Sequence, residues 1–167
     1  WMEPALPYTF FGIAVLGTGI LMGGAWAYEA LSFGGFWAWD PVENASLVPW
    51  LTLVGTGHLL LINKRKDTSI FTAFFLALLT FLLVLYSSFL TRSGVLGDTS
   101  VHSFTGEGML PGLLIFMLTF VMVAVAALNT DKGNRRFYVA ISAVIFVLGI
   151  ALQVYVPAIL LFGAVSV

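Results

Sequence analysis

Long apolar runs, separated by short polar segments, are the feature that most constrains how this chain can fold. The runs cover roughly residues 8–28, 45–62, 70–90, 109–128 and 137–163. A helix needs about 20 mainly apolar residues to cross the hydrocarbon core of a bilayer, and only helices or closed barrels can do so. The second run is short, but the apolar stretch around Trp37 and Trp39 extends it. The sequence therefore predicts an all-α, polytopic membrane helix bundle with about five transmembrane helices.

The composition agrees with this prediction. Hydrophobic residues make up 60% of the chain and charged residues 9%, whereas about a quarter of the residues in a soluble domain are charged. This number of charged residues is too small to cover a water-exposed surface. Most of the surface must therefore face lipid. The net charge of -1 and the lack of a long basic run give no sign of nucleic-acid binding. The chain has no cysteine, which excludes disulfides and thiolate metal sites within it.

We expect residues 1–167 to be one membrane domain, either an excerpt of a longer protein or one piece of a split one. The chain begins at Trp1 rather than Met, and no basic segment or small-residue cleavage site marks its start. We therefore expect no signal peptide. In the last apolar run, Pro157 is expected to kink the helix or to end it early.

The charges of the polar segments predict the orientation. Lys64–Lys66 follow the second run, and Lys132–Arg136 follow the fourth. If every run crosses the membrane, both basic segments lie on one side, which the positive-inside rule makes cytoplasmic. The opposite side then holds residues 29–44 and 91–108, whose single cation is Arg92. We expect this outer side to face the periplasm of a bacterial inner membrane, or its organellar equivalent.

A tryptophan-rich segment occupies residues 29–50, and its centre reads FGGFWAWDPVENASLVPW. Asp40 is placed to N-cap a helix, Pro41 to fill the first helical position and Glu43 the third, as in a capping box. We therefore expect a helix to start at Asp40 and Pro49 to bend it. This interpretation makes Asp40 and Glu43 helix-start residues rather than acid–base catalysts.

Capping does not explain the aromatic side chains of this segment. Phe33, Phe36, Trp37 and Trp39 lie close together in the sequence, beside adjacent glycines. One explanation is an interfacial belt, since Trp and Tyr gather at the level of the lipid headgroups. The other is a flat aromatic shelf, whose glycines allow close backbone approach, for a large planar ligand such as haem. A belt needs only scattered aromatic residues, so the clustering favours the shelf.

These residues carry a resemblance to a known family. The tryptophan-rich segment is similar to the signature of the haem-handling proteins of cytochrome c biogenesis. Within that superfamily, the run DPVENASLVPWL at 40–51 resembles the CcmF haem lyase subunit more than the haem exporter CcmC or the CcsA-type synthetases. The run TRSGVL at 91–96, followed by Val101 and His102, also matches the CcmF pattern. The resemblance covers roughly residues 20–110.

The sequence departs from the family pattern in one respect. Phe33 and Phe36 stand where the family often has Trp. The stacking surface is kept, but the indole N–H donors of those positions are lost. Hydrogen bonding to haem from these two positions is therefore not expected.

His58 lies inside the second run, about 27 Å along the helix from Asp40. An ionisable residue within a membrane span indicates function; the alternative is a neutral histidine hydrogen-bonded to a neighbouring helix. We expect Gly55 and Gly57 to leave room beside it for a bulky partner. The resemblance implies that His58 is an axial ligand of a membrane-embedded b-type haem (haem b), whose second ligand lies on a helix outside this chain.

The other histidine, His102, lies in the outer segment 91–108. From the residues alone it can be an ordinary exposed loop histidine. The resemblance implies that it is an external ligand of the haem on the aromatic shelf. Arg92, at the end of the third run, either pairs with Asp98 or Glu107 while reaching the interface, or makes a bidentate contact with a haem propionate.

The leading interpretation is a CcmF-like haem lyase subunit. The resemblance implies that it receives haem from a haem chaperone and, with other maturation subunits, helps attach it to the Cys-x-x-Cys-His motif of apocytochrome c. It also implies two sets of haem contacts. The cofactor-binding residues are Phe36, Trp37, Trp39, Asp40, Trp50 and Arg92, and the iron ligands are His58 and His102.

Two other interpretations remain at this point. A haem exporter or synthetase of the CcsA type would use His58 in an inward haem-loading site, although the DPVENA run at 40–45 argues against it. A lipid-facing scaffold or small transporter with an aromatic belt would bind no haem. It would be colourless when purified and would not need either histidine.

Overall fold

A computed structural model of the chain describes residues 1–167 apart from 32–34, 67, 98–99, 101–108, 130 and 166–167, and it describes no side chain at 109 or 149–165. The described residues form five α-helices: α1 (Met2–Ala30), α2 (Pro41–Arg65), α3 (Ile70–Arg92), α4 (Met109–Leu128) and α5 (Lys132–Val165). No strand occurs in this described part. The predicted all-α class is confirmed.

The first four helices are long and apolar enough to cross a membrane, with the span in α4 covering Leu110–Leu128. The chain is therefore part of an integral membrane protein. The last helix, α5, has 34 residues, and its role as a fifth span stays a prediction. Because α5 continues to Val165, the expectation that Pro157 ends this helix early is wrong. In the same way, α2 runs without a break through Pro49.

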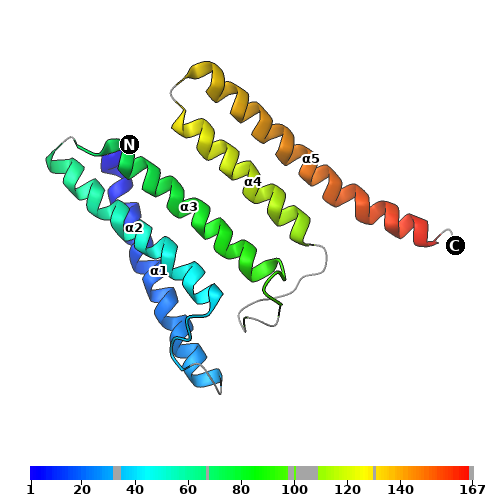
Figure 1. Ribbon diagram of the computed structural model, residues 1–167, viewed down its shortest axis with the longest axis horizontal. Helices are drawn as coiled ribbons and strands as arrows, with labels where there is room; N and C mark the ends of the chain where they lie inside the picture. Colours follow the sequence, from blue (N-terminus) through cyan, green and yellow to red (C-terminus); the bar gives the residue numbers. More distant parts are fainter. Residues whose placement is uncertain (32–34, 67, 98–99, 101–108, 130, 166–167) are drawn as a thin grey trace.

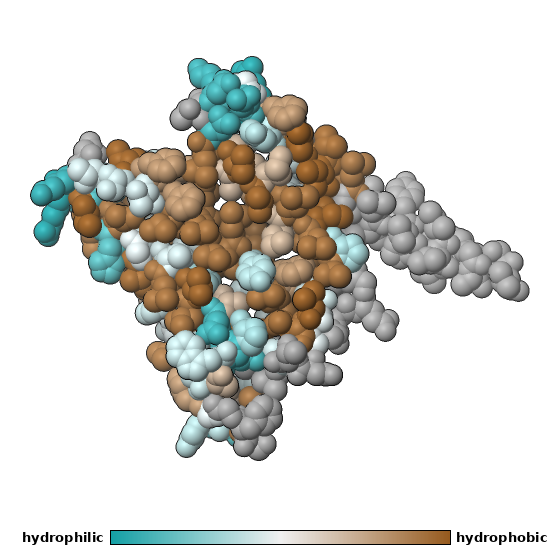
Figure 2. Space-filling model, in the orientation of Figure 1, coloured by the Kyte–Doolittle hydropathy of each residue, from teal (hydrophilic) through white to brown (hydrophobic). Residues whose placement is uncertain are grey.

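The helices form a row in chain order, in which each described helix contacts only its neighbours in the sequence (Figure 1). The C-terminal ends of α2 and α4 and the N-terminal ends of α3 and α5 lie at one end of the row, and the C-terminal ends of α1 and α3 lie at the other. Lys64–Lys66 and Lys132–Arg136 therefore share one end, as predicted. Between the hydrophilic ends the visible surface is mostly hydrophobic (Figure 2), as expected of a surface in lipid.

Small and hydroxyl-bearing side chains bring α1, α2 and α3 close together. A Cβ added at Gly57 would lie 3.1 Å from the Cδ1 atom of Ile13 on α1. The hydroxyls of Thr52 and Thr80 share a 2.8 Å hydrogen bond that joins α2 to α3. Lipid gives no hydrophobic drive for helices to associate, so close packing and interhelical hydrogen bonds hold such helices together.

This packing corrects one expectation about His58. Gly57 faces α1, and a Cβ at Gly55 would lie 3.5 Å from Leu76 of α3. Both glycines therefore serve contacts between helices. The expectation that they leave room for a bulky partner beside His58 is wrong.

Candidate functional site

The predicted helix start at Asp40 is confirmed. One carboxylate oxygen of Asp40, Oδ1, accepts the Val42 N–H at 2.7 Å. Glu43 reaches back, and its Oε2 atom accepts the N–H groups of Asp40 at 3.1 Å and Ala38 at 2.9 Å. Pro41 fills the first helical position. These contacts satisfy amide groups that the helix itself cannot, and they fix the chain that leads into α2.

Trp39 lies at the centre of this network in a strained conformation. Its φ angle is 56°, in the left-handed region that costs a non-glycine residue about 1–2 kcal/mol. Glu43 holds the amides on both sides of it, and the Asn44 side chain donates to its carbonyl at 3.0 Å. The residue is nevertheless 70% exposed. A large ring held outward by strained backbone is typical of a site that is organised before its ligand arrives.

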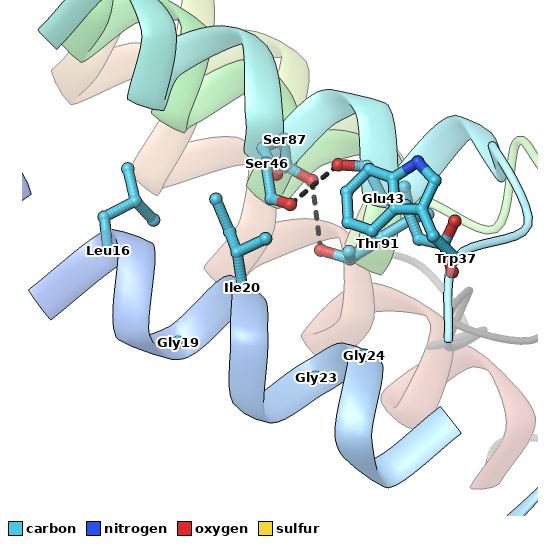
Figure 3. Close-up of a pocket in the computed structure, with 11 residues that line it drawn as sticks. Leu16, Gly19, Ile20, Gly23, Gly24, Trp37, Glu43, Ser46, Ser87 and Thr91 are labelled. Carbon is cyan, nitrogen blue, oxygen red and sulfur yellow. Dashed lines mark hydrogen bonds between the residues drawn. The ribbon is translucent and has the colours of Figure 1, made fainter. Parts of the chain in front are cut away.

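Trp37 connects this exposed ring to a cleft. The two indole rings meet edge to face, with centroids 6.1 Å apart and an interplanar angle of 88°. Trp37 lines a cleft of about 260 Å³ between the C-terminal parts of α1 and α3 and the N-terminal part of α2, called the outer cleft below after the side on which we expect it (Figure 3). Its other lining residues are Leu16, Gly19, Ile20, Gly23, Gly24, Val42, Glu43, Ser46, Ser87 and Thr91.

The walls of the cleft are mainly apolar, with hydroxyls on the side of α2 and α3. Ser46 donates to the Glu43 carbonyl at 2.7 Å, and Thr91 donates to the Ser87 carbonyl at 3.1 Å. Each of these hydroxyls donates its proton to a carbonyl of its own helix, so it can only accept a further hydrogen bond. The cleft therefore suits a mainly apolar group, and any polar contact with these two hydroxyls needs a donor on that group.

Sequence reasoning missed the contribution of α1 to this cleft. A Cβ added at Gly19 or Gly23 would meet no atom within 4 Å, whereas one at Gly24 would lie 2.6 Å from the ring of Phe36. Gly19 and Gly23 of α1 thus leave open space, whereas Gly24 lies directly against the ring of Phe36. The spacing of four between Gly19 and Gly23 was the available signal, because residues four apart share a helix face.

Gly24→Ala is expected to displace Phe36 and destabilise the outer end of α1. The added Cβ would lie 2.9 Å from the backbone oxygen of Phe36 as well as against its ring, and overpacking of this kind costs about 1–3 kcal/mol. Thermal unfolding of the full-length protein measures the loss. Gly23→Ala is the matched control, since its Cβ meets open space and it should keep or slightly raise the unfolding temperature, as alanine favours the helix over glycine. Equal effects of the two substitutions would contradict this packing.

Trp50 lies apart from the cleft lining, between α1 and α2. Its indole N–H donates to the Ile13 carbonyl at 3.0 Å. A Cβ at Gly17 would lie 2.8 Å from the indole nitrogen, so the ring rests directly on this glycine. The polar atom of Trp50 is thus used to hold α1 against α2.

His58 forms a second, separate location. It is exposed on α2, and its Nδ1 atom lies 2.8 Å from the Val54 carbonyl. A carbonyl oxygen can only accept, so in the neutral ring Nδ1 carries the proton and Nε2 keeps its lone pair. Such a fixed tautomer, with Nε2 free, is the form in which histidine binds a metal. His58 is not among the residues that line the outer cleft.

The outer segment 91–108 is described only in part, and His102 lies outside the described residues, as do Asp98 and Glu107. Arg92 is exposed at the end of α3, next to Thr91 of the cleft lining. Ser100 is buried, and its hydroxyl donates to Asp40 Oδ1 at 2.8 Å. At this residue, the outer segment lies against the tryptophan-rich segment.

These features define a class of protein: a polytopic helical membrane protein that holds an exposed tryptophan beside a cleft at one end of its helices. A family profile described as cytochrome C assembly protein matches residues 3–96, more than half of the chain. The chain belongs to the cytochrome c assembly protein family.

Individual relatives support the assignment of the chain to this family. The cytochrome c-type biogenesis protein CcmF of Pseudomonas aeruginosa is 41% identical over 125 residues, covering 75% of this chain and 18% of the relative. CcmF of Escherichia coli is 40% identical over 132 residues, or 77% of this chain and 20% of the relative. CycK of Rhizobium meliloti is 41% identical over 123 residues, or 74% and 18%.

The resemblance to CcmF found in the sequence is confirmed by these relatives. The chain spans about a fifth of their length, between 18% and 20%. No solved structure matches it.

Proposed function

We propose that this chain is the haem-presenting part of a cytochrome c haem lyase subunit. The observation that carries the proposal is Trp39, clamped in a strained and exposed conformation edge-on to Trp37 beside the outer cleft. The rings present flat apolar surface to a planar macrocycle, and membership of the cytochrome c assembly family points to haem as that macrocycle. Here haem is the substrate that is passed on to apocytochrome c.

In the proposed outer site, Trp37, Trp39 and Phe36 supply the stacking surface, and Asp40 holds the segment in place. Arg92 is exposed beside the cleft and has the charge and fork geometry to bind a propionate. We assign an axial iron ligand to His102. We assign Trp50 to packing between α1 and α2, because its only polar atom is already bonded to Ile13.

A second haem, resident within the membrane, is proposed at His58. The residue fits such a role because its Nε2 lone pair is free on an exposed helix face. A b-type haem held there would supply an electron that keeps the iron of the transferred haem reduced. A CcsA-type exporter would instead load haem at His58 from the cytoplasmic side.

The attachment itself is an addition of thiol to vinyl. Each cysteine of the apocytochrome motif forms a sulfur–carbon bond to one vinyl carbon, and its proton goes to the other, so no oxidant is needed. Positioning supplies most of the catalysis, since the substrate brings its own thiols. We propose that a haem chaperone and apocytochrome c bind on the outer, periplasmic side, with other maturation subunits beside them, and that Lys64–Lys66 face the cytoplasm.

The proposal is tested with the full-length protein purified from haem-replete cells. Wild type is expected to carry haem with a reduced b-type spectrum. The double variant Trp37→Ala/Trp39→Ala is expected to bind added haem about tenfold less tightly or worse at the outer site, given about 1 kcal/mol for each ring. The yield of mature cytochrome c should fall with it.

The matched control replaces an exposed aromatic pair far from the outer end. Phe71 and Phe75 stack on α3 with centroids 6.4 Å apart, and Phe71→Ala/Phe75→Ala is expected to keep both haem binding and cytochrome c yield. A colourless wild-type protein would rule out haem binding and leave the scaffold or transporter interpretation.

A further inference from the structure

The outer cleft has a polar end and an apolar end. Its lining on α1 runs from Leu16 to Gly24, which is about 12 Å of helix. Trp37 and Glu43 lie at one end, near Gly24, and Leu16 lies at the other (Figure 3). Leu16 is the deeper of the two ends of this lining, because it lies further inside the apolar span Met2–Ala30. The cleft is therefore an elongated slot along a membrane helix, with its charged group near the end of the span.

The size of the cleft suits a chain rather than a haem macrocycle. Its volume of about 260 Å³ lies below the roughly 300–1,000 Å³ of pockets that enclose drug-sized molecules. Gly19 and Gly23 are exposed, and a Cβ added at either would meet no atom within 4 Å. The slot is therefore open along the glycines of α1, the first helix of the row. On a helix of spanning length, this opening is within reach of the acyl chains of a bilayer.

The charge of the lining favours an ammonium group at the polar end. Glu43 is the only ionisable residue among the described residues that line the cleft, so a phosphate or carboxylate there would meet a like charge. Its Oε2 atom accepts two backbone N–H groups, and a carboxylate can accept about four hydrogen bonds. The hydroxyls of Ser46 and Thr91 can only accept as well. A cationic donor satisfies all three groups, whereas an anion satisfies none of them.

We propose that the outer cleft binds one acyl chain of a phospholipid with an ammonium head group, the class to which phosphatidylethanolamine belongs. The chain lies along Gly19 and Gly23, and the ammonium donates to Glu43. The bound chain fills the space beside Trp37 and so supports the ring against which Trp39 is held. The lipid is a structural ligand of the cleft, and its binding needs no haem.

The head-group preference is tested by titrating the full-length protein in detergent with phosphatidylethanolamine or with phosphatidylglycerol that has identical acyl chains. Native mass spectrometry measures the bound lipid. Wild type is expected to bind phosphatidylethanolamine about threefold more tightly, as one partly solvated ion pair allows. Glu43→Gln keeps a side chain that can complete the capping box but removes the charge. This variant should bind both lipids equally.

The chain position is tested with Gly19→Leu and Gly23→Leu, whose new side chains enter the open space of the cleft. Each variant is expected to bind phosphatidylethanolamine at least about tenfold less tightly, because several methylene groups of the lipid lose their contacts. Neither should unfold at a lower temperature when lipid is absent. Ala14→Leu is the matched control, since residue 14 is exposed on α1 and does not line the cleft. It should keep the wild-type affinity.

Four results would overturn the proposal. Equal affinity of wild type for the two lipids would remove the ammonium contact. Unchanged lipid binding by both leucine variants would place the lipid elsewhere. A lower unfolding temperature of both variants, with no lipid bound by wild type, would mean that another helix of the full-length protein fills the cleft. Leucine variants that lost haem but kept the lipid would assign the cleft to haem.

Discussion

Replacing His58 with alanine is expected to abolish the reduced b-type absorption of the haem proposed at His58, while haem still binds at the proposed outer site. The reason is the geometry of this one ring: Nδ1 is held by the Val54 carbonyl at 2.8 Å, and only Nε2 remains to bind iron. Alanine offers no ligand, so the loss should be complete. Spectra of the full-length protein, taken with dithionite at stoichiometric haem, measure it.

Two further measurements test whether the absorption is lost because an iron ligand is lost. Added imidazole should restore much of the band in His58→Ala, because the free ligand can occupy the space of the lost ring. Leu61→Ala removes a neighbouring exposed side chain of α2 (43% exposed) and should keep the spectrum. A His58→Ala protein with an unchanged spectrum would show that another residue carries the ligand role.

The second large effect is expected at Trp39. Removing its ring should weaken haem binding, whereas relieving its backbone strain with glycine should raise the stability. Trp39→Gly removes the ring and relieves the left-handed conformation at φ 56°. Trp39→Ala removes the ring but keeps the strain. Both variants should bind haem at least about tenfold less tightly at the outer site. The glycine variant should nevertheless be more stable than the alanine variant by about 1 kcal/mol, after the extra freedom of glycine in the unfolded chain is subtracted.

The unfolding temperatures of the two variants, measured in one detergent, give this difference. Trp39→Phe is the control for the ring, since it keeps an apolar face and should retain much of the haem affinity. If Trp39→Ala were as stable as Trp39→Gly, the backbone of residue 39 would not be strained. If the glycine variant bound haem like wild type, the exposed ring would have no part in binding.

The features that the sequence predicted well are the local ones. Apolar runs of spanning length foretold α1 to α4, because a helix in lipid must satisfy its own backbone. The capping box at Asp40 was also predictable, since it needs only residues three apart in the sequence. The tryptophan-rich segment was found for the same reason, as its chemistry lies within a few consecutive positions.

The features that escaped prediction depend on distant parts of the chain. Nothing near Gly57 in the sequence reveals that it faces Ile13 of α1. The expectation of open space beside His58 was therefore wrong. The glycine face of α1 becomes a wall of the cleft only when Trp37 is packed beside it. The Trp39 conformation follows from hydrogen bonds of Glu43 and Asn44, whose residue types are also compatible with an ordinary helix start.

The row of helices bears on how the chain is made. Because each described helix contacts only its sequence neighbours, the contact order is low, and each new span can dock onto the one inserted just before it. The Asp40–Ser100 bond breaks this pattern, with its partners 60 residues apart. The spans can therefore assemble in pairs during synthesis, whereas the contact between Asp40 and Ser100 can form only after both α2 and α3 have been synthesised.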